Sequence, residues 1–183
     1  MTVIGTVGLP GSGKSEAAVV ARELDIPVVT MGDVIRRECR DRGLDPTSDH
    51  GQVASALRTE NGPAAVAQRS LPIIEECRED AETVLVDGIR SDVEVETFER
   101  AFGEAFVLVS IEAPFETRAE RLEVRGRDAK ESDGGESLEE RDSRERGFGM
   151  DDAMDQADIT IQNDGSLAAF HEQIHDVLTG EDR

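Results

Sequence analysis

The sequence contains no tryptophan, no tyrosine and only two lysines, and it lacks a long apolar run. A bilayer-spanning helix needs about 20 apolar residues in succession, so no transmembrane segment is predicted. Residues 1–11 have neither a basic region nor a cleavage site, which argues against a secretory signal. Cys39 and Cys77 have no CxxC spacing, which favours reduced thiols over a disulfide framework or a zinc site. We therefore expect a cytoplasmic protein.

Positive charge is also scarce. Asp and Glu total 41 and Lys and Arg total 20, which gives a formal net charge of −21 at pH 7. Such a chain has no basic face for broad nucleic-acid binding, and an anionic membrane surface would repel it. We expect a small-molecule partner and no nucleic acid or membrane, while the oligomeric state stays open.

Short apolar runs alternate with helical patterns along the chain. The runs are apolar on both faces, which is typical of a parallel sheet covered on both sides. The alternation predicts a single α/β domain over 1–183, a three-layer sandwich with about five parallel strands. The expected strands are 2–7, 27–31, 83–87, 106–112 and 158–162, and the clearest helices are 14–24, 63–78 and 166–179.

One stretch breaks this alternation. Residues 125–149 are charged and glycine-bearing with almost no apolar residue. Taken alone, this composition predicts a solvated loop or a disordered linker.

The sequence GLPGSGKS at residues 8–15 fits the GxxxxGK[ST] pattern between a predicted strand and a predicted helix. Glycines allow the backbone amides to turn toward a phosphate, and the following helix adds its positive N-terminal end. Lys14 can reach the β- and γ-phosphates of a nucleotide, and the Ser15 hydroxyl can bind Mg²⁺. The expected ATP-binding residues are Gly8, Leu9, Pro10, Gly11, Ser12, Gly13, Lys14 and Ser15.

This phosphate loop, or P-loop, occurs in kinases, GTPases and motor ATPases. No NKxD base-reading motif of GTPases is present in the sequence. Motor ATPases usually carry paired acids after a long apolar strand, whereas VLVDGIRS at 84–91 has only Asp87 directly after its strand. The kinase class is therefore favoured.

Three further segments resemble the nucleoside-monophosphate kinase group. The first is TMGDVIRRE at 30–38, which is similar to the GDxLR segment of that group. The second is VDGIR at 86–90, similar to DGFPR but one residue shorter and without the proline, and the third is RLEVRGR at 121–127. The resemblance covers nearly the whole chain and includes adenylate kinases, dephospho-coenzyme A kinases and an archaeal adenylate-kinase-like family of uncertain substrate.

The resemblance implies an acceptor-binding helical region over 32–80. Arg36 would grip the acceptor phosphate, with Asp33 as a further substrate contact. Asp87 would lie near Mg²⁺ together with Ser15, and Arg90 would bind the acceptor phosphate. Arg58 and Arg69 are possible additional acceptor contacts.

The resemblance also implies a mobile lid insertion over 125–149. Arg121, Arg125 and Arg127, at its entry, would bind ATP phosphates and lie near the adenine. Arg141 and Arg144, at its exit, would close over the transferred phosphoryl group. Lys14, Asp87, Arg90, Arg121, Arg125, Arg141 and Arg144 are thus the expected catalytic residues.

Two classes of function remain open from the sequence. The first is an ATP- and Mg²⁺-dependent kinase, with a nucleoside monophosphate as the leading acceptor and dephospho-coenzyme A as the next. The second is an ATP-binding regulatory switch that hydrolyses slowly and has no acceptor, because residues 43–62 match no acceptor-base pattern.

The abundant acid and scarce lysine resemble the composition of proteins from salt-accumulating archaea. Because self-repulsion of the surface is screened within about 3 Å at 1 M salt, we expect the melting temperature to rise with KCl up to molar concentrations. Thermal melts in a KCl series test this prediction, and a melting temperature that does not change with KCl would contradict it.

Overall fold

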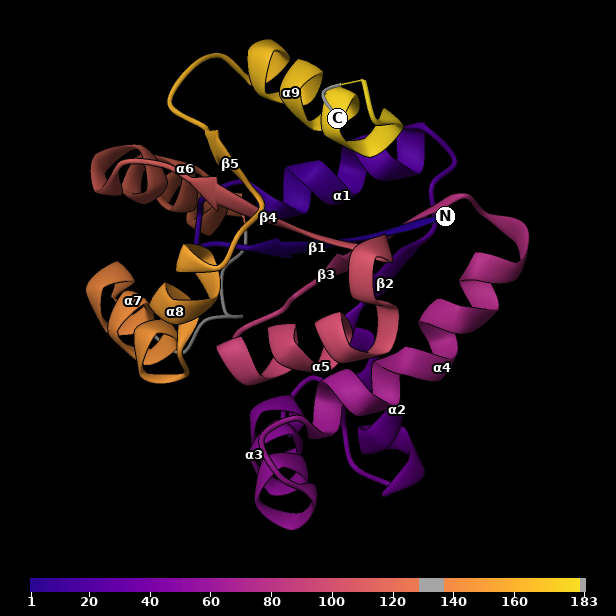
Figure 1. Cartoon of the computed structure of the whole chain (residues 1–183). Coiled ribbons are helices and arrows are strands. Elements are labelled where there is room, and N and C mark those ends of the chain that lie inside the picture. The colour runs from indigo at the N-terminus through magenta and orange to yellow at the C-terminus, as the bar shows by residue number, and fades with distance from the viewer. Residues whose placement is uncertain (129–136, 182–183) are drawn as a thin grey trace.

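The computed structural model describes residues 1–128 and 137–181, without the side chains of 124–128. Its centre is a five-stranded parallel sheet in the order β2-β3-β1-β4-β5 (Figure 1). The strands are β1 (Thr2–Val7), β2 (Val28–Thr30), β3 (Thr83–Asp87), β4 (Phe106–Glu112) and β5 (Ile159–Gln162). The predicted parallel sheet and its five strands are confirmed.

Helices cover both faces of the sheet, as predicted (Figure 1). One face carries α1 and α9, which pack against each other, and the other carries α2, α4, α5 and α8. The helices are α1 (Lys14–Glu23), α2 (Met31–Asp41), α3 (His50–Asn61), α4 (Ala65–Asp80), α5 (Asp92–Phe102), α6 (Phe115–Asp128), α7 (Leu138–Gly147), α8 (Met150–Asp155) and α9 (Leu167–Thr179), with a 3₁₀ turn at Gly103–Ala105.

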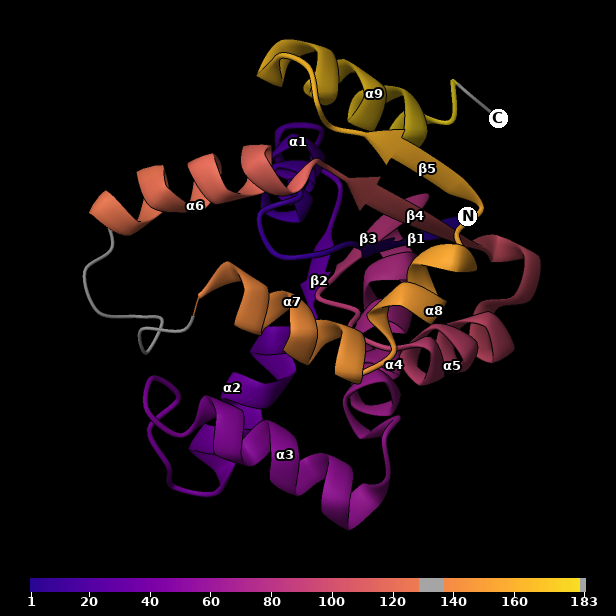
Figure 2. The ribbon, with the colours of Figure 1, turned by 90° about the vertical axis from the view of Figure 1, so that its left-hand side faces the viewer.

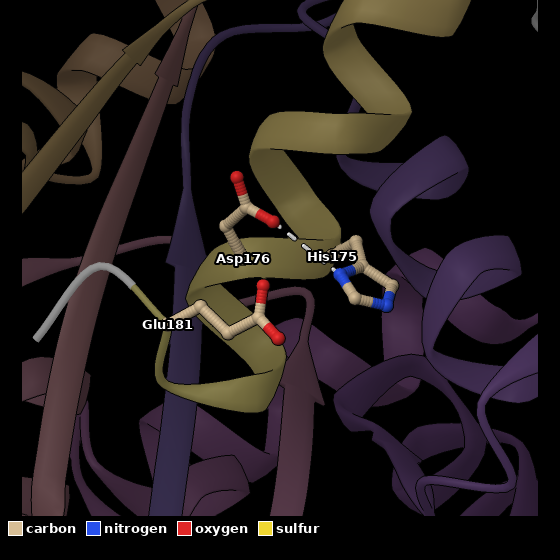
Figure 3. Close-up of side chains that lie close together, drawn as sticks. All are labelled: His175, Asp176 and Glu181. Atoms are coloured by element: carbon tan, nitrogen blue, oxygen red, sulfur yellow. Dashed lines mark hydrogen bonds and ion pairs between the residues drawn. The ribbon is translucent and has the colours of Figure 1, made fainter.

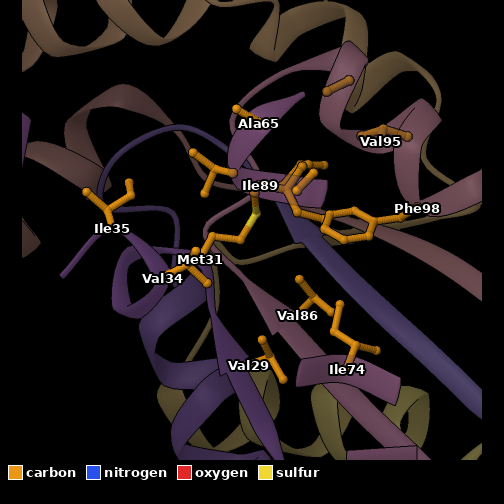
Figure 4. Close-up of a cluster of buried hydrophobic side chains, with 14 of the residues drawn as sticks. Val29, Met31, Val34, Ile35, Ala65, Ile74, Val86, Ile89, Val95 and Phe98 are labelled. Carbon is orange, nitrogen blue, oxygen red and sulfur yellow. The ribbon is translucent and has the colours of Figure 1, made fainter. Parts of the chain in front are cut away.

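Successive side chains along a strand point to opposite faces of the sheet, which divides the hydrophobic core into two layers. In β1, Val3 and Val7 join the cluster under α2, α4 and α5, whereas Ile4 joins the cluster under α1 and α9. This is the two-residue period of a strand with both faces buried. Figure 4 shows the first cluster, in which Met31 and Phe98 are among the largest fully buried side chains.

The register of the sheet brings three strand ends together. Gly5 of β1 lies beside Val86 of β3, Val7 lies beside Ser110 of β4, and Thr30 of β2 lies beside Asp87. Because the strands are parallel, the residues that follow each of them emerge at one edge. In open α/β sheets, ligands bind in the crevice outside this carboxyl edge.

The expected loop over 125–149 is wrong for much of its length. Residues 125–128 continue α6 and residues 138–147 form α7, while 129–136 lie outside the described residues. A capping box starts α7: the Ser137 hydroxyl accepts a hydrogen bond from Glu140 N at 3.2 Å, and Ser137 N donates one to the Glu140 carboxylate at 2.8 Å. The composition of this segment gave the wrong prediction because α7 contacts the rest of the protein through charged side chains rather than apolar ones.

Phe98 provides a test of this core. Its ring is fully buried and lies 5.8 Å from the Phe106 ring centroid. Phe98→Ala should lower the free energy of unfolding by about 3–5 kcal/mol because it opens a cavity. Leu167→Ala, at a side chain that is 58% exposed, is the control and should change it by less than about 0.5 kcal/mol. Chemical denaturation of both variants measures the difference, and equal losses would contradict the packing described.

Candidate functional site

The predicted strand–loop–helix arrangement of the phosphate loop is present. Gly8 follows β1 with φ of 147°, and Gly13 caps α1 with φ of 122°. A Cβ at Gly8 would lie 2.3 Å from the Ile111 carbonyl oxygen, and one at Gly13 would lie 2.4 Å from Asn163 Nδ2. Both positions therefore require glycine for backbone conformation and for space. The first amides of α1, at Lys14 and Ser15, have no acceptor within the helix and can point at an anion.

Lys14 folds back over this loop. Its Nζ donates hydrogen bonds to the carbonyl oxygens of Gly8 and Leu9, the second at 3.2 Å. Burial lowers the pKa of Lys14 to about 8, although the nearby carboxylates of Asp87 and Glu145 oppose the shift. An anionic ligand would therefore stabilise the charged form of the Lys14 ammonium group.

A cavity of about 960 Å³ opens beside Lys14 at the carboxyl edge of the sheet. Its lining contains six cationic side chains, and Asp87 is the one acidic residue among the described lining residues. In a chain of net charge −21, this local excess of positive charge indicates an anionic ligand. The cationic residues are Lys14, Arg36, Arg58, Arg90, Arg141 and Arg144.

Asp87 ends β3 and shares the cavity with Ser15. Desolvation raises the pKa of the Asp87 carboxyl group, and the positive charges of Lys14 and Arg90 partly offset this. Carboxylate and hydroxyl oxygens are hard ligands of the type Mg²⁺ prefers. The two residues thus fit the expected Mg²⁺ position in their chemistry and in their shared cavity.

Arg36 lines the cavity, whereas Asp33 is not among its lining residues, and the expected grip of Arg36 on an acceptor phosphate stays a prediction. Asp33 lies in the first turn of α2, and its carboxylate is 2.7 Å from Arg36 Nη2 in an exposed pair. Thr30 is the N-cap of α2. The structure therefore brings Asp33 to Arg36 rather than to the cavity itself.

Arg58 lines the cavity, but Arg69 does not. Arg69 instead donates a hydrogen bond to Asn61 Oδ1 at 3.2 Å and lies 3.6 Å from a carboxylate oxygen of Glu38. These contacts belong to the outer surfaces of α2, α3 and α4.

Glu94 is a fully buried carboxylate that sequence reasoning missed. It accepts hydrogen bonds from the backbone N of Arg90 at 2.9 Å and from Arg58 Nη2 at 3.2 Å. Burial raises the pKa of Glu94, and these two donors counteract the shift. Glu94 therefore holds two residues that line the cavity, Arg58 through its side chain and Arg90 through its backbone. The spacing Ser91–Glu94 signals only a helix start in the sequence.

His50, the first residue of α3, is a second residue that the sequence did not reveal. It lines the cavity, and its buried Nε2 has no hydrogen-bond partner among the described residues. Burial lowers the pKa of His50, and the charges of Arg36, Arg90 and Arg58 add to this effect. A neutral imidazole nitrogen is therefore available to a ligand beside three guanidinium groups.

Arg141 and Arg144 of α7 line the cavity, and their expected closure over a phosphoryl group stays a prediction. Arg90 also lines it, and its Nη1 donates a 2.6 Å hydrogen bond to the buried carboxylate of Glu145. Glu145 lies 3.6 Å from Arg144 Nη2 as well. An acid that looks solvated in the sequence thus sits among the cations of the site.

Arg121 supports the phosphate loop from outside the cavity. Its Nη1 lies 3.3 Å from the Ser12 carbonyl oxygen, and its Nη2 donates 3.0 Å hydrogen bonds to both the backbone and side-chain oxygens of Asn163. Asn163 Nδ2 donates to the Ser12 carbonyl at 2.8 Å. Asn163, which sequence reasoning did not single out, therefore joins the segment after β5 to the loop. The side chains of Arg125 and Arg127 lie outside the described residues.

A separate group of possible metal ligands lies at the end of α9. Ligand atoms of His175, Asp176 and Glu181 all lie within 4.8 Å of one another, and His175 Nδ1 is 3.4 Å from Asp176 Oδ1 (Figure 3). None of the three lines the cavity beside Lys14.

Among the described residues, no helix has the length and apolar content needed to cross a membrane.

The phosphate loop at the carboxyl edge of a five-stranded parallel sheet defines the fold of P-loop kinases. A family model described as an AAA domain matches residues 7–139. A UPF0200 protein of Halobacterium salinarum is 61% identical over 181 residues, which are 99% of this chain and 94% of the relative. A UPF0200 protein of Methanosarcina mazei is 45% identical and covers 98% of this chain and 95% of its own length. The chain belongs to the UPF0200 family.

Solved structures support the fold. Shikimate kinase from Acinetobacter baumannii has a TM-score of 0.58 at 16% identity, covering 99% of this chain and 94% of its own. A gluconokinase from Sinorhizobium meliloti has a TM-score of 0.59 at 14% identity, covering 98% of this chain and 93% of its own. At such identities the likeness concerns the fold alone. It agrees with the predicted P-loop architecture without selecting the nucleoside-monophosphate subtype.

The lowered pKa of Lys14 predicts that ATP binding depends on pH. The free protein loses the Lys14 charge above about pH 8, whereas bound phosphates would favour the charged form and raise its pKa. The affinity for ATP and Mg²⁺ should therefore fall as pH rises through 8, by up to about tenfold per pH unit. Titrations of labelled ATP between pH 7 and 10 measure this fall in affinity. Lys14→Ala is the control, which should bind ATP weakly and show no fall in affinity around pH 8. A flat profile for the unsubstituted protein would contradict the assignment.

Proposed function

We propose that this protein transfers a phosphoryl group from ATP to a small anionic acceptor, a nucleoside monophosphate, in a Mg²⁺-dependent reaction. The observation that carries the proposal is the cavity beside Lys14, where six cationic side chains converge in a strongly acidic protein. Phosphoryl transfer needs positioning and charge neutralisation more than covalent catalysis, and guanidinium groups supply both.

The donor side of the site is the phosphate loop. The amides at the start of α1 and the Lys14 ammonium would hold the ATP phosphates. Ser15 and Asp87 would hold Mg²⁺, which would neutralise phosphate charge when bound. Asn163 donates a hydrogen bond to the Ser12 carbonyl oxygen, so the segment after β5 lies against this loop.

The acceptor side lies between β3 and α2–α3. Arg36, Arg58 and Arg90 offer guanidinium groups, and the same cavity includes apolar surface from Ile35, Val66 and Phe148. A phosphate joined to a flat apolar base matches such a lining. The apolar and cationic surfaces together favour a substrate with one anionic end.

Two other acceptors share this chemistry. Dephospho-coenzyme A also combines phosphates with an adenine, and the names of the shikimate kinase and gluconokinase neighbours indicate hydroxylated acids as acceptors of those proteins. A carboxylate pairs with arginine in the same bidentate manner as a phosphate. These compounds belong in the test, together with a regulatory role in which ATP is hydrolysed slowly without an acceptor.

A panel assay in molar KCl tests the proposal. Purified protein is supplied with ATP and Mg²⁺ and with each of the nucleoside monophosphates, dephospho-coenzyme A, shikimate or gluconate. Transfer stimulated by a nucleoside monophosphate is expected. ATP binding with no stimulated transfer across the panel would favour the regulatory role, and no ATP binding would overturn the proposal.

Arg36→Ala tests the acceptor side. Arg36 lines the cavity, so its loss should raise the acceptor KM or lower kcat by about tenfold or more while the ATP affinity stays unchanged. Arg37→Ala is the matched control, because Arg37 is the next residue of α2, is exposed and is absent from the cavity lining. Steady-state kinetics with the best acceptor measure both variants. Loss of ATP affinity in Arg36→Ala would contradict its assignment to the acceptor.

A further inference from the structure

The helix α7 presents charges of opposite sign on two adjacent faces. Arg141 and Arg144 are three residues apart and both line the cavity. Asp142 and Glu145 are also three residues apart, and both are buried. Residues at this spacing share a helix face, so one face of α7 carries the arginines and the next carries the acids.

The acidic face is bound to the rest of the protein at two points. Asp142 is paired with Arg118 from the first half of α6, and Glu145 is paired with Arg90 after β3. Figures 1 and 2 both show α7 beneath α6. Arg90 is about half exposed, whereas the Arg118 and Asp142 side chains are 5% and 6% exposed. The pair of Arg118 with Asp142 is therefore the enclosed one.

Arg118 connects three segments through directed hydrogen bonds. Its Nη1 and Nη2 donate to the two carboxylate oxygens of Asp142 at 2.8 and 2.6 Å. Nη1 also donates to the carbonyl oxygen of Pro10 in the phosphate loop at 3.0 Å, and Nε donates to the Ala113 carbonyl at 3.2 Å. A planar guanidinium with a bidentate partner fixes orientation as well as distance.

We infer that Arg118 and Asp142 are positioning residues, which fix the rotation of α7 relative to the phosphate loop so that Arg141 and Arg144 face the nucleotide phosphates. The expected effect on ATP binding rests on the proposed function, whereas the fixed orientation of α7 rests on the hydrogen bonds of Arg118. Because Pro10 belongs to the loop that would bind ATP, the same guanidinium sets the distance between that loop and the two arginines. Neither Arg118 nor Asp142 lines the cavity, so neither would touch the ligand, and the effect of Asp142 passes through α7 and its two arginines.

The test uses Asp142→Asn in the full chain. The amide keeps the size of the side chain but removes the charge and one of the two acceptors. Asp151→Asn is the matched control, since Asp151 of α8 forms an exposed 3.2 Å pair with Arg146 of α7. Hydrogen exchange of the α7 amides should become faster in Asp142→Asn and stay unchanged in Asp151→Asn.

The consequence is measured by titration of ATP and Mg²⁺ in molar KCl. Asp142→Asn and Arg141→Ala should each weaken binding about tenfold, and the double variant should be weakened by much less than the product of the two. Such coupling is expected of a residue that acts through Arg141, whereas a purely structural role predicts additive losses. Additive losses, or α7 exchange equal to that of the control, would overturn the inference.

Failure of the proposed function would look different. If the unsubstituted protein binds no ATP, the proposed function falls, while the exchange rates still decide whether Asp142 anchors α7. Should Asp142→Asn not fold, the double variant Arg118→Met and Asp142→Leu replaces the ion pair with apolar groups, a change that buried pairs often tolerate. It is expected to fold and to bind ATP more weakly, and binding equal to that of the unsubstituted protein would overturn the inference.

Discussion

The mutual repulsion of cationic side chains around Lys14 is the constraint on which the rest of the site depends. Two unit charges 4 Å apart repel by about 4 kcal/mol at an effective dielectric constant of 20, so six cations cannot share a cavity without compensation. Three acids near the site reduce that repulsion: the partly buried Asp87 interacts electrostatically with Lys14, the buried Glu94 holds Arg58, and the buried Glu145 holds Arg90. The acids thus maintain a cluster of positive charge for a ligand that is itself anionic.

This arrangement explains which parts of the site could be predicted from the sequence. The phosphate loop is a contiguous motif whose glycines are required by local backbone geometry, so its position after β1 followed from the pattern alone. Asp87 was also identified, because an acid directly after a buried strand is unusual. The five strands were found because each is an apolar run flanked by clear turns.

The supporting acids could not be found in the same way. Asp142 and Glu145 lie in a charged stretch whose composition is typical of a solvated loop, and their partners Arg118 and Arg90 are 24 and 55 residues away in the chain. Such pairings depend on how α7 packs against α6 and the segment after β3, which no local pattern encodes. The position of His50 in the site could not be predicted for a similar reason. A single histidine at the start of a helix forms no recognisable motif, and its role depends on the packing of α3 beside Arg36.

Salt affects the two kinds of ion pair differently. At molar salt the screening length is about 3 Å, so exposed pairs such as Asp33 with Arg36 lose most of their attraction while enclosed pairs retain theirs. The Arg118–Asp142 pair would therefore keep α7 in place under conditions that weaken the exposed pair of Asp33 with Arg36. An acidic protein that works in concentrated salt consequently needs its site-forming ion pairs to be buried, and the contacts of α7 meet that requirement.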